Sequence, residues 1–185
     1  MHISLDGFVC GPNGEMNWIK INDEIFNHVE KRISGTDTAM YGRVTFGMME
    51  AYWPTAALQA NPSSHDINHS RWYAQAQKLV LSTTILQDGR PDLTVINHDF
   101  ADHIRALKND GEGEILVFGS PSTTHALIRE GLIDGYWLFV NPIVLGQGIP
   151  LFKSVASSIP LDLVSSKIFE CGVTELNYLV KPNEL

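Results

Sequence analysis

The sequence has few cysteines and no excess of positive charge. Its two cysteines, Cys10 and Cys171, lie far apart and form no CxxC pattern. A disulfide framework or a cysteine-based metal site needs more cysteines at closer spacing. Lys and Arg number 13 against 21 Asp and Glu, which gives a formal net charge of −8. Nucleic-acid binding needs a basic surface that neutralises phosphates, so this charge argues against that class of protein.

Long hydrophobic runs and internal repeats are also missing. The apolar runs fall short of the roughly 18 residues that a membrane-spanning helix needs, and Met1 leads into residues 2–8 without the charged and apolar regions of a secretory signal. With 44% hydrophobic and 18% charged residues, the composition is that of a globular protein. We therefore expect one cytoplasmic domain over residues 1–185 that binds neither membranes nor nucleic acids.

Hydrophobic periodicity predicts a helix, a strand and a second helix in the first third of the chain. Apolar residues recur three and four apart over residues 18–33, which predicts a helix that stops before Gly35. A short strand that ends near Gly42 leads into the second helix. We expect the inner face of that helix to carry Val44, Met48 and Met49.

The middle third continues the alternation of strands and helices. Residues 55–77 are polar and contain a proline and several amides, so we expect a surface loop or an irregular helical excursion without core residues. The other predicted elements here are strands over 78–85, 93–96 and 114–119, and helices over 99–110 and 122–131. Asp99 is the expected cap of the first of these helices, with Phe100, Ile104 and Leu107 inward. Gly131 is expected to close the second.

The last third changes to a purely strand-like pattern. Residues 136–152 read as a long apolar strand and a glycine turn, and residues 161–180 as two strands around Cys171 and Gly172. Alternating strands and helices that end in an antiparallel hairpin predict an α/β fold with a mostly parallel sheet.

A junction with a candidate ligand-binding role lies after the predicted strand at 114–119. Gly119 is followed by small hydroxyl residues at the start of a helix, and Pro121 suits a first helical turn. Helix starts at the carboxyl ends of parallel strands offer N–H groups to anions. Ser120, Ser122 and Thr123 could add hydroxyl donors, although Ser and Thr also cap helices without binding a ligand.

Two further strand ends carry similar residues. Arg43 and Thr45 follow Gly42 where a strand gives way to a helix, so a guanidinium and a hydroxyl could meet the same polyanion. Residues 82–84 are Ser82, Thr83 and Thr84, which could surround a phosphate, but a simple turn would look the same.

The order of these segments resembles the dihydrofolate reductase-like superfamily. The segments are SLDGFVCGPNGEMNW, YGRVTF, KLVLSTT and ILVFGSPSTTHALIREGLIDGYWLFVNPIVLGQGIPLF, and the similarity is to the branch of the reductase domain of the riboflavin-biosynthesis deaminase-reductase. The resemblance implies a three-layer α/β fold and NADPH as cofactor. The cofactor residues that it implies are Gly42, Arg43, Thr45, Ser82, Thr83, Thr84, Gly119, Ser120, Pro121, Ser122 and Thr123.

The sequence departs from this superfamily in two places. Fewer residues than usual precede the SLDG segment, so either the true start lies upstream of Met1 or the first central strand is short. Residues 57–77 are longer and more polar than the minimal fold needs, which suggests a lid or a partner surface. His65 and His69 in this segment have a metal-compatible spacing on a helix, but no third ligand is nearby, and we expect no metal site.

The candidate residues for binding and protonating the substrate all lie within the first 26 residues. Trp18 and Asp23 resemble the tryptophan and the acidic residue of dihydrofolate reductases, so Asp23 is the candidate catalytic acid. Glu24 competes for this role, and an acidic residue in a first helical turn also stabilises a helix without any catalytic function. Asp6, Trp18 and Phe26 are the candidate substrate-binding residues.

These observations predict an NADPH-dependent reductase that transfers a hydride to a pteridine, pyrimidine or related small heterocycle. The alternative is a non-catalytic nucleotide-binding or regulatory module on the same fold. The apolar final third and the resemblance also predict a homodimer.

Overall fold

The protein is described by a computed structural model that covers residues 1–111, 113–153 and 155–182. The chain divides into two compact units, one formed by Asp23–Thr123 and the other by Met1–Asn22 with Thr124–Leu185. The prediction of a single domain over residues 1–185 stays a prediction. Within the described residues, no helix combines the length and the apolar character that crossing a membrane requires.

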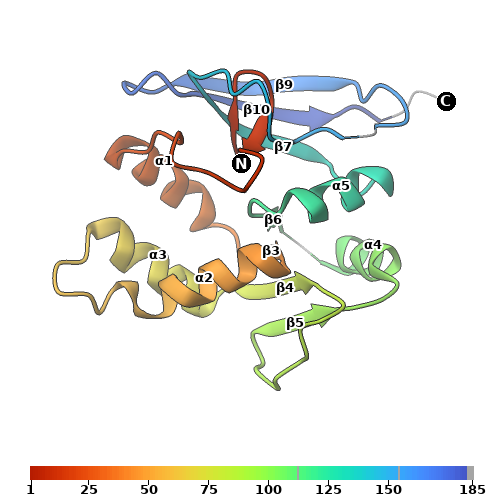
Figure 1. Ribbon diagram of the computed structural model, residues 1–185. Coiled ribbons are helices and arrows are strands. Elements are labelled where there is room, and N and C mark those ends of the chain that lie inside the picture. The colour runs from red at the N-terminus through yellow and green to blue at the C-terminus, as the bar shows by residue number, and fades with distance from the viewer. Residues whose placement is uncertain (112, 154, 183–185) are drawn as a thin grey trace. The chain divides into compact units, whose positions relative to one another are not determined.

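The unit Asp23–Thr123 contains sheet C, a four-stranded parallel sheet flanked by helices (Figure 1). Its strand order is β5-β4-β3-β6, and every described pairing in it is parallel. The strands are β3 (Thr38–Gly42), β4 (Gln77–Leu81), β5 (Leu93–Ile96) and β6 (Ile115–Val117). The helices are α1 (Asp23–Ile33), α2 (Arg43–Ala56), α3 (Ser64–Gln75) and α4 (Phe100–Asp110), together with the first residues of α5 (Pro121–Arg129).

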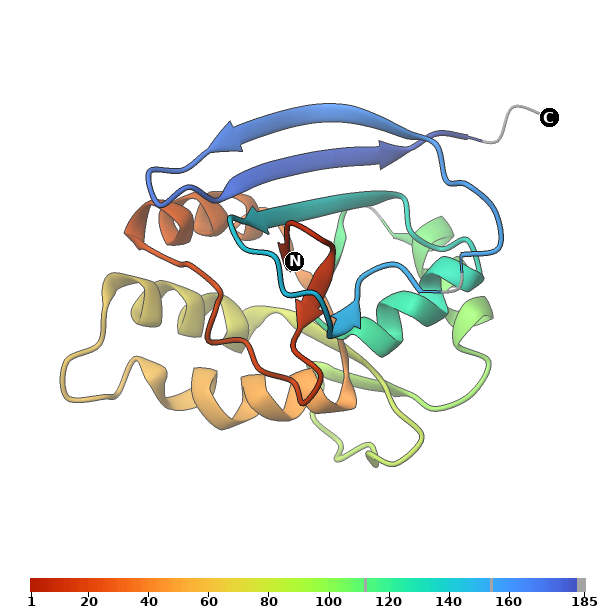
Figure 2. The same ribbon diagram turned by 45° about the horizontal axis from the view of Figure 1, so that its top comes forward.

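The other unit contains the mixed sheet A, in the order β1-β7-β10-β9. Figure 2 shows its long C-terminal hairpin, in blue, beside β7 in teal. The strands are β1 (His2–Ser4), β7 (Gly135–Asn141), β9 (Leu161–Ile168) and β10 (Thr174–Val180); β2 (Phe8–Cys10) and β8 (Ile149–Pro150) form a separate pair. β1 is parallel to β7, and the other pairings are antiparallel. The α/β class with an antiparallel C-terminal hairpin is thereby confirmed.

Each unit has its own hydrophobic core. The core of Asp23–Thr123 joins the sheet to α2 and α3 through Ala39, Tyr41, Phe46, Tyr73, Val80 and Leu93. The core of the other unit consists of Ile3, Val9, Cys10, Tyr136, Leu138 and Leu151.

The first helix is shorter than predicted. α1 begins at Asp23, so Trp18 and the upstream apolar positions precede it. The Trp18 Nε1 group donates to the Glu15 carbonyl at 3.0 Å, and the Lys20 N–H donates to Asn141 Oδ1 at 2.8 Å. These contacts hold residues 18–20 outside the helix, so the helical spacing upstream of Asp23 was coincidental.

The predicted inner face of α2 is right for Met49 and wrong for Val44 and Met48. Val44 and Met48 are 64% and 49% exposed, whereas Phe46 is 6% exposed. Met49 and Trp53 pack on the same core cluster as Phe46. Because the helix begins at Arg43, the buried stripe runs through Phe46 at helical spacing and leaves Val44 in solvent.

The prediction that the polar segment 55–77 contributes no core residues is also wrong. Ser63 and Asp66 form a reciprocal capping box at the start of α3. His69 and Tyr73 on this helix are 6% and 2% exposed. Histidine and aromatic residues form its inner face, and such a face gives a weak signal in an aliphatic periodicity search. His65 and His69 do share the helix, but the described residues contain no cluster of three metal ligands.

The predicted cap and inner face of α4 are partly wrong. Asp99 occupies the N-cap position in a left-handed conformation with φ 47°, and its side chain makes no capping hydrogen bond. That side chain instead contacts His98 Nδ1 at 3.0 Å. Ile104 is buried as expected, but Leu107 is 40% exposed.

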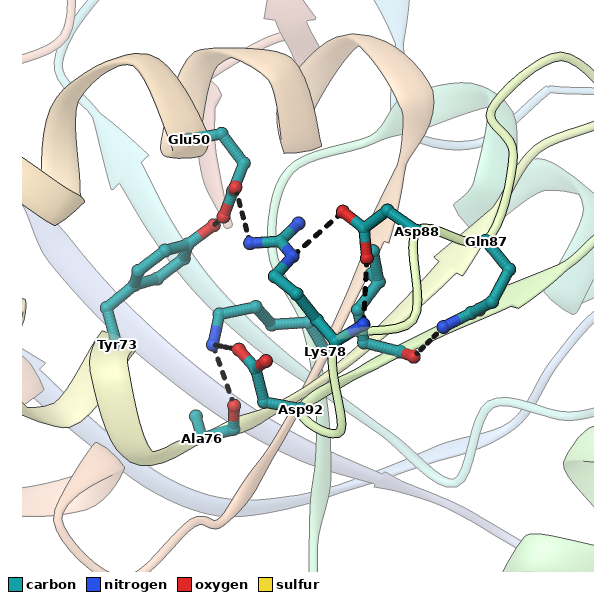
Figure 3. Close-up of polar contacts among 9 residues, drawn as sticks. Glu50, Tyr73, Ala76, Lys78, Gln87, Asp88 and Asp92 are labelled. Carbon is teal, nitrogen blue, oxygen red and sulfur yellow. Dashed lines mark hydrogen bonds and ion pairs between the residues drawn. The ribbon is translucent and has the colours of Figure 1, made fainter.

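Polar side chains fasten the connection between β4 and β5 to the neighbouring helices (Figure 3). Glu50 on α2 accepts from the Tyr73 hydroxyl at 2.6 Å and pairs with Arg90 at 2.7 Å. The buried Lys78 ammonium donates to Asp92 at 2.8 Å and to the Ala76 carbonyl at 2.9 Å. The hydrogen bond from Lys78 lowers the pKa of the Asp92 carboxyl below its ordinary value.

The buried His69 predicts a loss of stability in mild acid. Burial, and next the charge of His65, lower the His69 pKa from 6.5 to about 3. Below pH 6.5 the unfolded chain therefore binds a proton that the folded chain does not, so stability falls as the pH drops towards 3. Between pH 7 and pH 5 this single group should remove up to about 2 kcal/mol.

Urea unfolding at several pH values checks this expectation. His69→Phe should flatten the dependence of unfolding free energy on pH between 7 and 5. His98→Gln, which removes an exposed imidazole, should leave the slope close to that of the wild type. Equal slopes for His69→Phe and wild type would contradict the expectation.

Candidate functional site

The strand order of sheet C reverses at β3. From β3 the chain adds β4 and then β5 on one side and later places β6 on the other. In open parallel sheets, ligands bind beyond the carboxyl ends of the two strands at such a reversal, because the connections that leave those strands run to opposite faces. The candidate site therefore lies where β3 and β6 end, and two of the predicted junctions are found there.

The junction after β3 places a glycine at the start of α2. Gly42 is the N-cap residue, with φ −87° and ψ 165°, and has no side chain to cap the helix. The first-turn N–H groups of a helix have no partners further back in the helix, so an anion can take the place of the missing cap. Arg43 is exposed and opens this turn, and Thr45 is half-buried.

The junction after β6 contains two consecutive left-handed residues. Gly119 has φ 54° and Ser120 has φ 55°. The Ser120 hydroxyl donates to the Phe118 carbonyl at 3.0 Å and accepts the Gly42 N–H at 2.8 Å. Pro121 then begins α5, where its fixed φ is suitable and its missing N–H is not needed.

The two junctions are in direct contact. A Cβ on Gly42 would lie 2.6 Å from Thr123 Oγ1, and a Cβ on Gly119 would lie 3.6 Å from Thr45. The structure therefore brings together Gly42, Thr45, Gly119, Ser120 and Thr123. Arg43, Pro121 and Ser122 adjoin them in the sequence, and Ser122 is exposed.

The third predicted strand end is occupied by its own turn. Ser82, which is 9% exposed, accepts from the N–H groups of Thr84 at 3.2 Å and Ile85 at 3.1 Å. This geometry fits the simple-turn alternative for the Ser82 hydroxyl. Thr83 and Thr84 are exposed at the end of β4, next to β3 in the sheet.

Two of the predicted substrate-side residues lie on α1. Asp23 is exposed at its first position, and Glu24 is half-buried. The Phe26 ring stacks on the His65 ring, with centroids 3.8 Å apart and planes within 10°. His65 also contacts Glu30 of α1 at 2.9 Å. This support of α1 by α3 was not expected from the sequence, because residues 55–77 predicted a surface loop or an irregular helical excursion without core residues.

The other two predicted substrate-side residues belong to the unit that contains sheet A. Trp18 is half-buried. Asp6 accepts from the Ser4 hydroxyl at 2.6 Å and from the N–H groups of Gly146 at 2.7 Å and Leu145 at 3.1 Å. The Ser4 hydrogen bond, and next those backbone donors, lower the Asp6 pKa to about 2. Asp6 thus fixes one loop to another as a carboxylate, and its substrate role stays a prediction.

A family assignment follows from the sequence as a whole. The model of the RibD C-terminal domain matches residues 1–174. The chain belongs to the RibD C-terminal domain family. It is 30% identical over 179 residues to YyaP of Bacillus subtilis (strain 168), an uncharacterized protein, with 95% of this chain and 90% of that one covered.

Solved structures of other proteins show the same fold. A putative riboflavin biosynthesis protein from Shewanella sp. PV-4 is 23% identical and superposes with a TM-score of 0.74, covering 98% of this chain and 97% of that one. A pyrimidine reductase-like protein from Corynebacterium diphtheriae is 15% identical, with a TM-score of 0.64 and coverage of 98% and 90%. The dihydrofolate reductase-like fold expected for a RibD C-terminal domain is thus confirmed.

The contact at Gly42 yields a steric prediction. Gly42→Ala should destabilise the protein by about 1 to 3 kcal/mol, because the new methyl group must displace the buried Thr123 side chain. Gly47→Ala is the matched control on the same helix, since no atom lies within 4 Å of its Cβ position. The control should gain up to about 1 kcal/mol from helix propensity. Urea midpoints measure both, and equal shifts would contradict the expectation.

Proposed function

We propose that this RibD C-terminal domain is an NADPH-dependent reductase acting on a pyrimidine, pteridine or related small heterocycle. The observation that carries the proposal is the meeting of two glycine-bearing junctions, after β3 and β6, at the reversal of strand order in sheet C. Membership of the RibD C-terminal domain family supports it, as does the fold shared with a pyrimidine reductase-like protein.

The residues at this reversal fit a dinucleotide pyrophosphate. Gly42 leaves the start of α2 without a side-chain cap, and Gly119 keeps bulk away from the backbone at the start of α5. Arg43 is exposed, so its guanidinium can form charge-assisted hydrogen bonds with phosphate oxygens. The donors come from both junctions, which suits an elongated anion better than a single small one.

The cofactor supplies the hydride when it is bound, and the protein supplies binding, orientation and a proton. In this proposal Gly42, Arg43, Thr45, Gly119 and the residues from Pro121 to Thr123 hold the phosphates. Thr83 and Thr84 line the neighbouring strand end. Asp23 or Glu24 at the start of α1 holds the proton that the reduced heterocycle requires.

The reaction is tested by following the oxidation of NADPH with a panel of pterins, pyrimidines and flavin precursors. Turnover with any of them supports a reductase. Saturable NADPH binding without turnover on the panel would favour the alternative, a nucleotide-binding module without catalysis. Absence of NADPH binding in calorimetry would contradict the proposal.

Arg43 is expected to contribute to cofactor affinity. Arg43→Ala should weaken NADPH binding by about 1.5 to 3 kcal/mol, through the loss of a charge-assisted bond to phosphate. Arg71→Ala, which removes an exposed arginine on α3, is the control and should bind as the wild type does. Isothermal titration measures both, and an unchanged affinity in Arg43→Ala would remove Arg43 from the site.

The two acidic residues of α1 can be separated by rate measurements. If Asp23 delivers the proton, Asp23→Asn should slow turnover about 10²-fold, with the loss easing at low pH and NADPH affinity nearly unchanged. If Asp23 acts only on the helix dipole, the rate should hold and stability should fall by at most about 1 kcal/mol. Glu24→Gln is measured in parallel, because Glu24 is the more buried of the two.

We also propose a homodimer. The strand β9 is at an edge of sheet A and exposes Leu163 (55%), Val164 (55%) and Ile168 (77%). Apolar edge strands favour pairing with another chain. Tyr136 and Leu138, from the run that first suggested a dimer, are buried within their own unit instead.

Light scattering at micromolar concentration should therefore give twice the chain mass of 20.6 kDa. Ile168→Asp should shift the mass towards one chain. A monomeric wild type would contradict the proposed assembly.

A further inference from the structure

The serine between β6 and α5 has an unfavourable backbone conformation. Ser120 and Asp99 are the non-glycine residues with positive φ in the described chain. A left-handed conformation is unfavourable for an ordinary L-residue, and such residues persist where the surrounding structure holds them. Gly119 also has a positive φ, 54°, but a glycine adopts this conformation without strain. A side chain at position 120 therefore requires a physical reason.

The proton of the Ser120 hydroxyl is already donated within the protein. Ser120 is 6% exposed, its proton is donated to the Phe118 carbonyl at 3.0 Å, and its oxygen accepts the Gly42 N–H at 2.8 Å. A hydroxyl has one proton to donate. Direct donation to a phosphate, as first expected for Ser120, would break the bond to Phe118.

The hydroxyl occupies a position in the ladder between β3 and β6. Met40 pairs with Val117, and the Phe118 N–H donates to the Met40 carbonyl at 3.0 Å. If the parallel pairing continued, the Gly42 N–H would donate to the Phe118 carbonyl. Instead the Ser120 hydroxyl lies between these two groups and bonds to both. The ends of β3 and β6 are therefore still connected, but through a bridging hydroxyl and not by a direct bond from the Gly42 N–H to the Phe118 carbonyl.

We propose that Ser120 is a positioning residue that sets the spacing of the β3 and β6 ends for a dinucleotide. This inference rests on the proposed function. With the hydroxyl in place, the starts of α2 and α5 are held apart at one fixed distance, and both can address the same pyrophosphate. Gly42 has no room for a side chain beside Thr123, and Gly119 lies next to Thr45, so a change in this spacing would displace both helix starts. Ser120 itself does not touch the phosphate.

Two substitutions separate positioning from a purely structural role. Ser120→Gly removes the hydroxyl and also the left-handed strain, whereas Ser120→Ala removes the hydroxyl and keeps the strain. Ser120→Gly should therefore be more stable than Ser120→Ala. Both should raise the NADPH dissociation constant by a similar factor of about tenfold or more, since small misplacements of binding groups lower affinity. At saturating NADPH, turnover should change far less than the KM for NADPH.

Asp99→Gly is the matched control for the backbone effect. It relieves the other left-handed residue of the described chain at a position outside the proposed site. It should leave NADPH affinity unchanged, even where its effect on the urea midpoint equals that of Ser120→Gly.

Amide hydrogen exchange distinguishes the hydrogen bond between Gly42 and Ser120 from a direct contact of Gly42 with phosphate. In the cofactor-free wild type, the Gly42 N–H should exchange slowly, because it already donates to Ser120. Rapid exchange of that N–H before NADPH is added would overturn the proposal. Wild-type affinity in both Ser120 variants would overturn it while leaving the proposed function standing. A wild type that does not bind NADPH would overturn both.

Discussion

The reversal of strand order at β3 is the constraint on which the candidate site depends. Because β4 and β6 flank β3 on opposite sides, the connections that leave β3 and β6 diverge and do not cover each other. Every feature used to argue for nucleotide binding, including the glycine at the start of α2 and the left-handed turn before α5, lies at this one place. The same residues at the ends of non-adjacent strands would form two unrelated helix caps.

The candidate site offers a local positive potential although the chain has a net charge of −8. Binding does not need a basic surface where backbone N–H groups and helix dipoles provide local positive potential. Arg43 adds a formal charge directly beside Gly42, where the dipole of α2 has the same sign. In the proposed function, the overall acidity would not prevent binding of an anion that these groups hold at short range.

The helix α3 gives α1 a second layer of support. Glu30 of α1 contacts His65 at 2.9 Å and Asn68 at 3.0 Å, and Phe26 stacks on the same His65. α1 carries the candidate acids Asp23 and Glu24, so their position depends partly on a segment that composition alone marks as a loop. The buried His69 on this helix remains uncharged at neutral pH, because its pKa is lowered by burial.

The sequence by itself determined the fold class, most strand positions and the two glycine junctions. Apolar runs such as residues 115–117 and glycines before helix starts are local signals, which neighbouring residues specify without reference to the rest of the chain. These local signals did not predict which residues are buried where burial depends on contacts with segments far away in the chain. Two of the three residues predicted for the inner face of α2 are exposed, because the face of the helix that is covered depends on how the helix packs against the sheet.

Only the tertiary structure decided which polar groups are available to a ligand. Ser82 and Ser120 look alike in the sequence, since each follows a strand within a cluster of small hydroxyl residues. In the fold, Ser82 completes its own turn, whereas Ser120 bonds to Gly42 at the end of β3, 78 residues away in the chain. The register of β3 against β6 sets that difference, and register depends on strand pairing between distant segments, which a single sequence does not reveal.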